Sequence, residues 1–207
     1  MALPQCICIT DVGPTNIGAA TIIRYKRELW LITAAHVPNK SQDFQQDIRS
    51  LPDEILLWIP GKKAPKGKRI RLFDEDPART PRFRYHRANG IFSDVICLPL
   101  AEVARTKGVR RHELIYSLDN LPLGNSLETF GFPDLNPQTA YPESKVQMEL
   151  VADNGGSLRT SKEFRQGYSG GPALANGTFI GIAIGSTDGL GTVISSRLIA
   201  QIIDGRA

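Results

Sequence analysis

The feature that most constrains the fold of this chain is a series of short apolar runs separated by turn-forming residues. The runs are rich in Ile, Val, Leu and aromatic residues and have strand length: AATIIRY, ELWLITAA, EILLWIP, KRIRLF, RFRYH, DVICLPL, SLETFGF, KVQMELV, PALAN and TFIGIAIG. Gly, Pro, Asn and Asp occupy almost every gap between them, and these residues favour tight turns. Because no long helical pattern alternates with the runs, the sequence predicts an all-β barrel or sandwich.

The C-terminal segment SSRLIAQIIDG is the exception. Its apolar residues recur at helical spacing from Leu198 to Ile203. Ser195 or Ser196 is suited to cap the N-terminus of a helix, and Gly205 is suited to end it. The sequence therefore predicts a C-terminal helix packed on a β body.

Composition excludes several classes of protein. The 207 residues are 22% charged and 41% hydrophobic, which is typical of a globular domain and not of a disordered or fibrous chain. No segment approaches the roughly 18 consecutive apolar residues of a membrane span, and the opening MALPQCICITDVG lacks the pattern of a signal peptide. Three cysteines are too few for a disulfide-stapled secreted domain. We therefore expect a cytoplasmic protein without a membrane association.

The sharpest local motif is GYSGGP at residues 167–172, in which a serine lies among glycines. Small neighbours allow backbone amides to approach a reacting carbonyl oxygen beside Ser169. The N–H groups of Gly167 and Ser169 are suited to form an oxyanion hole, which is worth roughly 2.7 to 4 kcal/mol per donor. The alternative interpretation is a glycine-rich β-turn without a chemical role.

Chain order limits which serine chemistry fits. The histidines are His36, His86 and His112, and all precede Ser169. The nucleophile elbow of α/β-hydrolases needs its histidine after the serine, so that interpretation fails. Subtilisin order needs an aspartate before the histidine, and only Asp11, in a turn-like DVG, precedes His36. The remaining order is His, Asp, Ser.

His36 and Asp94 are the partners that this order selects. His36 ends the run LWLITAAH, where small alanines leave room for another side chain. Asp94 begins DVICLPL, where an unpaired carboxylate beside apolar residues is costly. A histidine N–H is a suitable partner for it.

TAAH, an aspartate at the head of an apolar strand, and GxSGGP resemble the trypsin/chymotrypsin-like serine peptidases in order and in spacing. The three cysteines make the compact bacterial-type domains the more similar ones. The resemblance implies a single domain over 1–207, built from two packed six-stranded antiparallel β-barrels and a C-terminal helix. The first barrel spans approximately 1–108 and the second approximately 113–207, with a helix or irregular connector at 101–112.

The same resemblance implies a serine endopeptidase that forms an acyl-enzyme without a metal or organic cofactor. His36 is the general base and then the acid, Asp94 holds its tautomer, and Ser169 is the nucleophile. Gly167 and Ser169 provide the oxyanion hole. Tyr168 stands where digestive relatives have an aspartate, so activation by an ion pair with a freed N-terminus is not expected.

Substrate contacts are implied less directly. The run FIGIAIGS resembles the strand that lines the substrate cleft, which assigns Ile184, Gly185 and Ser186 to the bound peptide. Six residues before Ser169, Glu163 corresponds to the base of the primary specificity pocket and favours Arg or Lys substrates. The alternative for Glu163 is an ordinary solvated residue. Without a propeptide or signal peptide in the sequence, we expect narrow specificity or control by a regulatory protein partner.

The middle of the chain is basic. From Lys62 to Arg111 there are 14 Lys/Arg and 5 Asp/Glu, although the net charge of the whole chain is only +4. A solvated loop is one interpretation. The other is a catalytically silent peptidase-fold module that binds an acidic partner or polyanion through this segment. Nucleic acid is not the expected partner, because no recognised binding motif accompanies the charge.

The remaining chemistry-bearing residues have ordinary interpretations. Cys6 and Cys8 lie on one face of a predicted strand, but no zinc-type spacing accompanies them, so free thiols are expected and no metal site is predicted. His86 is interpreted as a surface or packing histidine, the alternative being a cover for the back of the site. His112 follows two arginines and is interpreted as an exposed connector residue.

Overall fold

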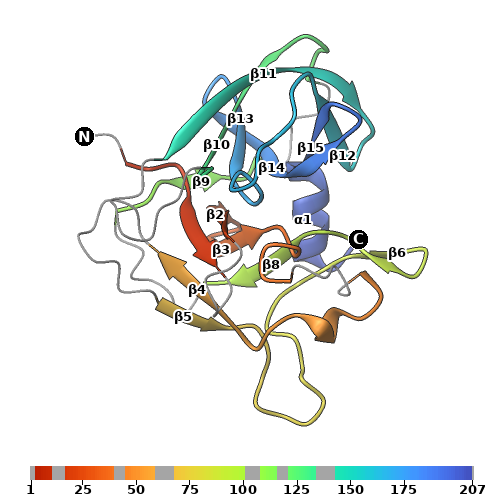
Figure 1. Ribbon diagram of the computed structural model, residues 1–207. Coiled ribbons are helices and arrows are strands. Elements are labelled where there is room, and N and C mark those ends of the chain that lie inside the picture. The colour runs from red at the N-terminus through yellow and green to blue at the C-terminus, as the bar shows by residue number, and fades with distance from the viewer. Residues whose placement is uncertain are drawn as a thin grey trace.

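The computed structural model describes residues 3–10, 17–39, 45–58, 68–100, 108–115, 121–133 and 143–206. Figure 1 shows two bodies of strands, one from each half of the chain, with a single long helix beside them. All described peptide bonds are trans. The all-β class and the terminal helix predicted from the sequence are confirmed.

The N-terminal half forms one curled sheet of seven strands. The strands are β1 (Ile7–Thr10), β2 (Ile17–Tyr25), β3 (Glu28–Thr33), β4 (Glu54–Trp58), β5 (Lys68–Arg71), β8 (Ile96–Pro99) and β9 (Arg111–Glu113). Their order is β5-β4-β1-β2-β3-β8, and β9 pairs separately with β2. A short 3-10 helix (Ile48–Ser50) and the hairpin of β6 (Arg87–Ala88) with β7 (Ile91–Phe92) complete this half.

The C-terminal half forms a closed six-stranded barrel, in the order β10-β11-β12-β15-β14-β13. Its strands are β10 (Ser126–Gly131), β11 (Ser144–Asp153), β12 (Ser157–Thr160), β13 (Pro172–Ala175), β14 (Thr178–Thr187) and β15 (Leu190–Ser195). Every neighbouring pair in the barrel is antiparallel.

The structure differs from the predicted architecture in two details. The described strands of the first half do not form a closed six-stranded order. β5 and β8 stand at its two ends, and the segment that follows β5 forms only isolated bridges, Phe73 with Pro81 and Arg84 with Cys97 of β8. The predicted helix or connector at 101–112 ends in strand β9, which runs parallel to β2 with His112 opposite Ile23. Residues 101–107 lie outside the described part of the chain. The residues of β2 that pair with β9 lie 89 positions earlier in the chain, so this pairing leaves no local pattern in the sequence.

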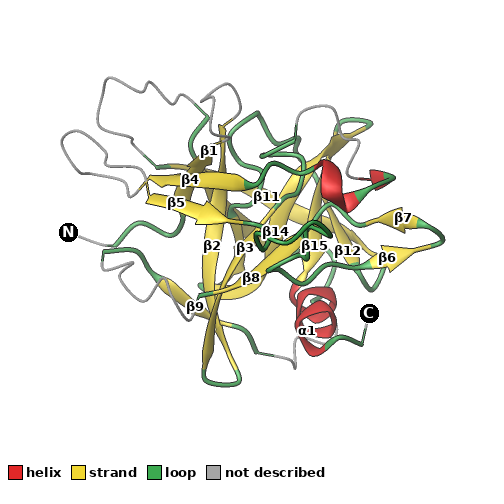
Figure 2. Ribbon diagram, turned by 90° about the horizontal axis from the view of Figure 1, so that it is seen from below, coloured by secondary structure: helices red, strands yellow, loops and turns green. Residues whose placement is uncertain are grey.

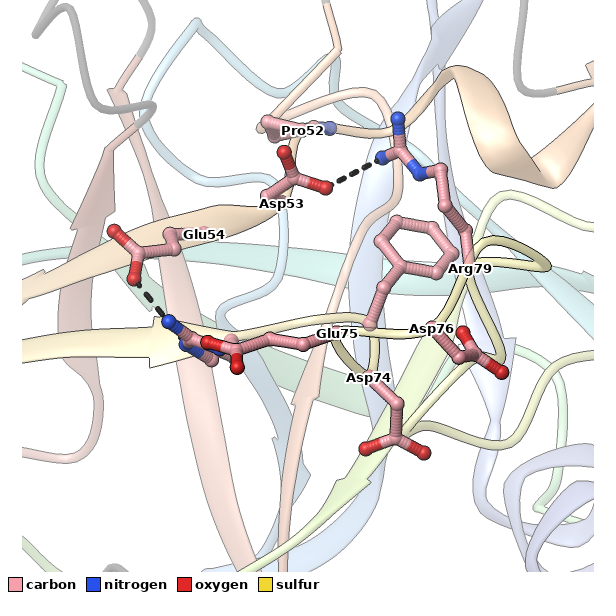
Figure 3. Close-up of a pocket in the computed structure, with 9 residues that line it drawn as sticks. Pro52, Asp53, Glu54, Asp74, Glu75, Asp76 and Arg79 are labelled. Atoms are coloured by element: carbon pink, nitrogen blue, oxygen red, sulfur yellow. Dashed lines mark hydrogen bonds and ion pairs between the residues drawn. The ribbon is translucent and has the colours of Figure 1, made fainter.

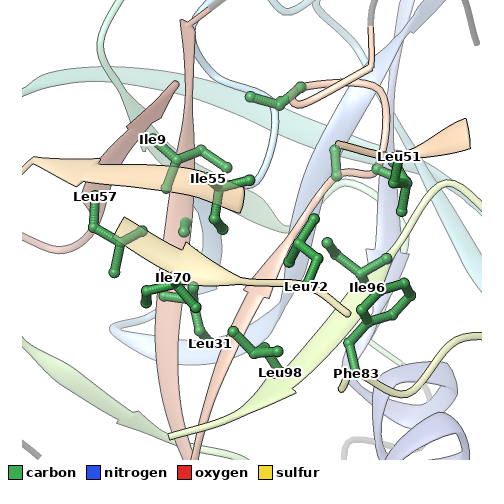
Figure 4. Close-up of a cluster of buried hydrophobic side chains, with 14 of the residues drawn as sticks. Ile9, Leu31, Leu51, Ile55, Leu57, Ile70, Leu72, Phe83, Ile96 and Leu98 are labelled. Carbon is green, nitrogen blue, oxygen red and sulfur yellow. The ribbon is translucent and has the colours of Figure 1, made fainter. Parts of the chain in front are cut away.

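Buried aliphatic and aromatic side chains fill the inside of the curled sheet (Figure 4). The labelled members come from all parts of this half: Ile9, Leu31, Leu51, Ile55, Leu57, Ile70, Leu72, Phe83, Ile96 and Leu98. A second cluster joins the two halves, since it contains Ile32 of β3, Ile182 of β14 and Ile199 of the helix. The two bodies are therefore held together by a continuous apolar contact.

Helix α1 (Ser196–Asp204) begins and ends where the sequence predicts. The hydroxyl of Ser195 accepts a hydrogen bond from the N–H of Leu198, and Gly205 ends the helix in the left-handed conformation. Figure 2 shows the helix beside the strands, near the C-terminus. Among the described residues, no helix is long and apolar enough to cross a membrane.

His112 is buried, which corrects the expectation of an exposed connector residue. Its side chain is 4% exposed, and Nε2 donates a hydrogen bond of 2.9 Å to the carbonyl oxygen of Gln5. Burial lowers the pKa of the imidazole, with a smaller contribution from the nearby positive charge of Arg110. The alternating exposure of the three β9 residues turns the side chains of Arg111 and Glu113 outward and this ring inward.

Candidate active site

Strand register brings His36 and Asp94 together. Thr33 at the end of β3 lies opposite Ile96 at the start of β8. His36 follows this pair by three residues in a turn, and Asp94 precedes it by two. Two segments that are distant in sequence therefore leave neighbouring strands at the same edge, with their side chains in reach of each other.

A continuous chain of hydrogen bonds joins the three predicted residues. Oδ1 of Asp94 accepts the backbone N–H of His36 at 2.9 Å, and Oδ2 is 2.6 Å from His36 Nδ1. His36 Nε2 is 2.9 Å from Ser169 Oγ. A carboxylate facing Nδ1 favours the tautomer with hydrogen on that nitrogen, which leaves Nε2 to accept from the serine hydroxyl.

The segment around Ser169 is fastened to the N-terminal sheet. The N–H of Ala19 donates to the carbonyl oxygen of Ser169 at 2.7 Å, and the hydroxyl of Thr21 donates to the carbonyl oxygen of Gly170 at 2.8 Å. Both donors lie on β2, next to the strand that delivers His36. The relative position of serine and histidine is therefore set by hydrogen bonds between the two halves.

Gly167 adopts a backbone conformation that favours glycine. Its φ of +97° is in the left-handed region, and a Cβ there would stand 2.5 Å from the carbonyl oxygen of Phe132. The carbonyl oxygen of Gly167 accepts a hydrogen bond of 3.0 Å from the N–H of Phe132. Within the described residues, the N–H groups of Gly167 and Ser169 make no hydrogen bond. Both donors are thus available to a negatively charged oxygen.

Comparison with known proteins identifies the fold. No protein-family model and no curated protein sequence matches this chain. Among solved structures, a serine endoprotease from Yersinia pestis superposes with a TM-score of 0.63 over 99% of this chain, at 17% identity. Human heparin binding protein superposes with a TM-score of 0.63 over 98% of this chain and 91% of its own, at 15% identity. This protein has the chymotrypsin-like serine peptidase fold. The chain spans 63% of the length of the Yersinia pestis protein.

In this peptidase fold, β14 leaves an open edge beside Ser169. Strand β13 pairs with β14 as far as Ile182, whereas β15 follows β14 to Thr187. Residues 184–187 therefore have no described strand on the β13 side. An extended peptide is able to add there by backbone hydrogen bonding.

The substrate-contact residues predicted on this strand have different surroundings. Ile184 is half-buried and packs against two apolar clusters, the one inside the curled sheet and the one that joins the two halves. The hydroxyl of Ser186 accepts from the N–H of Phe164 at 2.6 Å and is used to hold that segment. Gly185 is half-buried, and Glu163 is exposed next to Phe164. Their part in substrate binding stays a prediction.

The peptidase fold predicts a strict requirement for glycine at position 170. Its φ is +87°, and a Cβ there would stand 1.9 Å from the carbonyl oxygen of Ala19. We expect Gly170→Ala to lower the free energy of unfolding by more than about 3 kcal/mol. Gly189→Ala is the matched control, because its φ is +76° with open space around the position, and it should lower the free energy by only about 1 to 2 kcal/mol. Urea unfolding measures both; equal losses would refute the steric argument.

His86 and the three cysteines have contacts or burial of an ordinary structural kind. His86 is half-buried with Nδ1 2.8 Å from the hydroxyl of Ser93. Cys6, Cys8 and Cys97 are buried free thiols, and burial raises the pKa of each. Among the described residues, no group of three or more His, Cys, Asp or Glu is arranged to hold a metal ion.

Sequence reasoning missed the residues that fasten the Ser169 segment. Ala19 donates through its backbone, and Thr21 and Thr33 donate through buried hydroxyls to carbonyl oxygens of other segments. A threonine in an apolar strand is common, so its position alone carries no signal of this role.

Proposed function

We propose that this protein is a serine endopeptidase of narrow or partner-controlled specificity. The observation that carries the proposal is the hydrogen-bonded series Asp94, His36, Ser169, which three separate segments form on a serine peptidase fold. The side chains of His36 and Asp94 are only 24% and 21% exposed. Partial removal from water strengthens the electrostatic interactions within the series.

The proposed reaction follows from the atoms that face each other. Ser169 Oγ attacks the carbonyl carbon of the scissile peptide bond while its proton passes to His36 Nε2. The N–H groups of Gly167 and Ser169 hold the oxyanion of the tetrahedral intermediate. His36 then gives the proton to the leaving amine, and water hydrolyses the acyl-enzyme with His36 as base again. Asp94 stabilises the imidazolium through its 2.6 Å contact.

The proposed substrate is an extended peptide that pairs with the open edge of β14 at residues 184–186. In this arrangement Gly185 leaves space for the peptide, and Ser186 with Phe164 closes one wall. Glu163 then lies near the first side chain on the acyl side and favours Lys or Arg there. A peptide library without basic preference would remove Glu163 from the proposal.

A catalytically silent binding module is the second candidate, since the fold also serves human heparin binding protein. It would use the basic segment from Lys62 to Arg111. Four arginines of that segment are already paired with carboxylates: Arg69 and Arg71 with Glu54, Arg79 with Asp53, and Arg82 with Asp74. Figure 3 shows the ion pair of Arg79 with Asp53, and that of Glu54 with Arg71, at a pocket rich in acidic side chains. This pairing favours the peptidase.

Labelling with a fluorophosphonate probe tests the proposal. We expect one adduct per molecule, and digestion with mass spectrometry should find it on Ser169. Heat-unfolded protein is the control and should remain unlabelled, because the reaction needs the assembled His36 contact. A folded protein that stays unlabelled, judged by circular dichroism, would contradict the peptidase and favour the binding module.

A further inference from the structure

A second cavity lies between β9 and the hairpin turn that joins β13 to β14. Its volume is about 200 Å³. The turn residues Asn176 and Gly177 both have positive φ, which is typical of a two-residue hairpin. We call this site the β9 cavity. None of the residues Asp94, His36 and Ser169 lines the β9 cavity.

The β9 cavity carries two positive charges without a carboxylate partner among the described residues. Arg110 and Arg111 line it, and neither forms an ion pair with a described residue. The carboxylate of Glu113, also at the cavity, is paired with Arg24 at 3.0 Å. Other arginines of the basic segment, such as Arg69, have carboxylate partners instead. An anionic ligand is therefore the natural complement here.

A buried histidine forms part of the same wall. His112 lines the cavity at 4% exposure, and its ring lies 5.8 Å from that of Phe179. Because Nε2 donates to Gln5, the neutral ring leaves Nδ1 as an acceptor, and Nδ1 makes no hydrogen bond to a described residue. A ligand with an N–H donor next to its acidic group would satisfy this nitrogen.

An exposed apolar side chain completes the surface. Ile115 lines the cavity and is 48% exposed, among few large apolar residues that are so open to solvent. A peptide offers all three complements at once: a carboxylate for the arginines, a backbone N–H for His112 and an apolar side chain for Ile115.

We propose that the β9 cavity and Ile115 bind a short acidic peptide segment of a partner protein, with an apolar residue beside the carboxylate. The site is independent of the peptidase proposal, because it uses none of the same residues. Such binding gives the protein a second docking point on β9 and the β13–β14 hairpin.

The test uses imidazole resonances, since the chain has only three histidines. The synthetic peptide GEELGS, acetylated and amidated, is titrated into ¹⁵N-histidine-labelled Ser169→Ala protein, which keeps the probe intact whether or not the protein is a peptidase. We expect saturable shifts of the His112 signals, without shifts of His36 or His86. Absence of a His112 shift overturns the proposal, as does equal binding of GQQLGS.

Matched variants separate the site from net charge. The double variant Arg110→Gln/Arg111→Gln should weaken binding at least tenfold. The control Arg69→Gln/Arg71→Gln removes the same charge from arginines paired with Glu54 and should change the affinity less than twofold. If both double variants lost affinity for the peptide equally, the binding would reflect only general charge attraction, and the proposed site would be refuted. Inorganic phosphate that binds as tightly as the peptide would overturn the assignment to a peptide.

Discussion

Ser169→Ala is expected to lower kcat for a cleavable peptide, selected from a library, by about 10⁶-fold without unfolding the protein. The substitution removes one oxygen, whose hydrogen bond goes to His36 Nε2. The backbone bond from Ala19 to the carbonyl oxygen of residue 169 remains, so the segment keeps its position. Initial rates and urea unfolding, measured on the same preparation, separate chemistry from folding.

Ser195→Ala is the matched control for this variant. Ser195 is also buried, at 6% exposure against 8% for Ser169, but its hydroxyl caps helix α1 and donates to the carbonyl oxygen of Gly155. We expect it to lower the free energy of unfolding by about 1 kcal/mol and to leave kcat nearly unchanged. If the two serine variants lost activity to the same degree, Ser169 would not be the nucleophile.

Asp94→Asn is expected to lower kcat about 10⁴-fold. One oxygen of Asp94 accepts the backbone N–H of His36 and the other faces Nδ1. An asparagine that keeps its oxygen on the backbone N–H turns its NH₂ group toward Nδ1. The ring must then carry its hydrogen on Nε2, which no longer accepts the proton of Ser169. The flipped amide opposes two donors at the backbone, so neither orientation restores the site.

The tautomer itself provides the measurement for Asp94→Asn. ¹⁵N spectra of His36 should change from the form protonated at Nδ1 to the form protonated at Nε2, in parallel with the loss of kcat. Glu54→Gln also converts a carboxylate to an amide, at a site that pairs with Arg69 and Arg71, and should change neither quantity. An unchanged His36 tautomer in Asp94→Asn would refute the orienting role.

Local sequence patterns were sufficient to predict an element where residues close together in the sequence form its contacts. The helix α1 was predictable because its apolar spacing, the cap at Ser195 and the stop at Gly205 all lie within eleven residues. Most barrel strands were predictable because apolar runs of strand length alternate with turn residues, as in the hairpin of β13 and β14 around Asn176 and Gly177.

Local sequence patterns gave the wrong prediction where pairing with a distant segment decides the structure. RFRYH, at residues 82–86, has the alternation of a strand, but within it only Arg84 forms an isolated bridge, to Cys97. His112 lies between charged residues and was expected at the surface, yet pairing of β9 with β2 turns its ring inward. In both cases the local residue pattern is visible in the sequence, but the distant segment that pairs with it is not.

The sequence by itself determined the all-β class, the terminal helix and the order of His36, Asp94 and Ser169, because these follow from residue type and spacing along the chain. Only the tertiary structure decided that the first sheet curls without closing and that β9 runs parallel to β2. It alone decided that the three side chains meet, through the pairing of Thr33 with Ile96 and the bond from Ala19 to Ser169. Such contacts join segments 63 to 150 residues apart, and their energy depends on backbone groups that every residue possesses, so side-chain identity does not encode them.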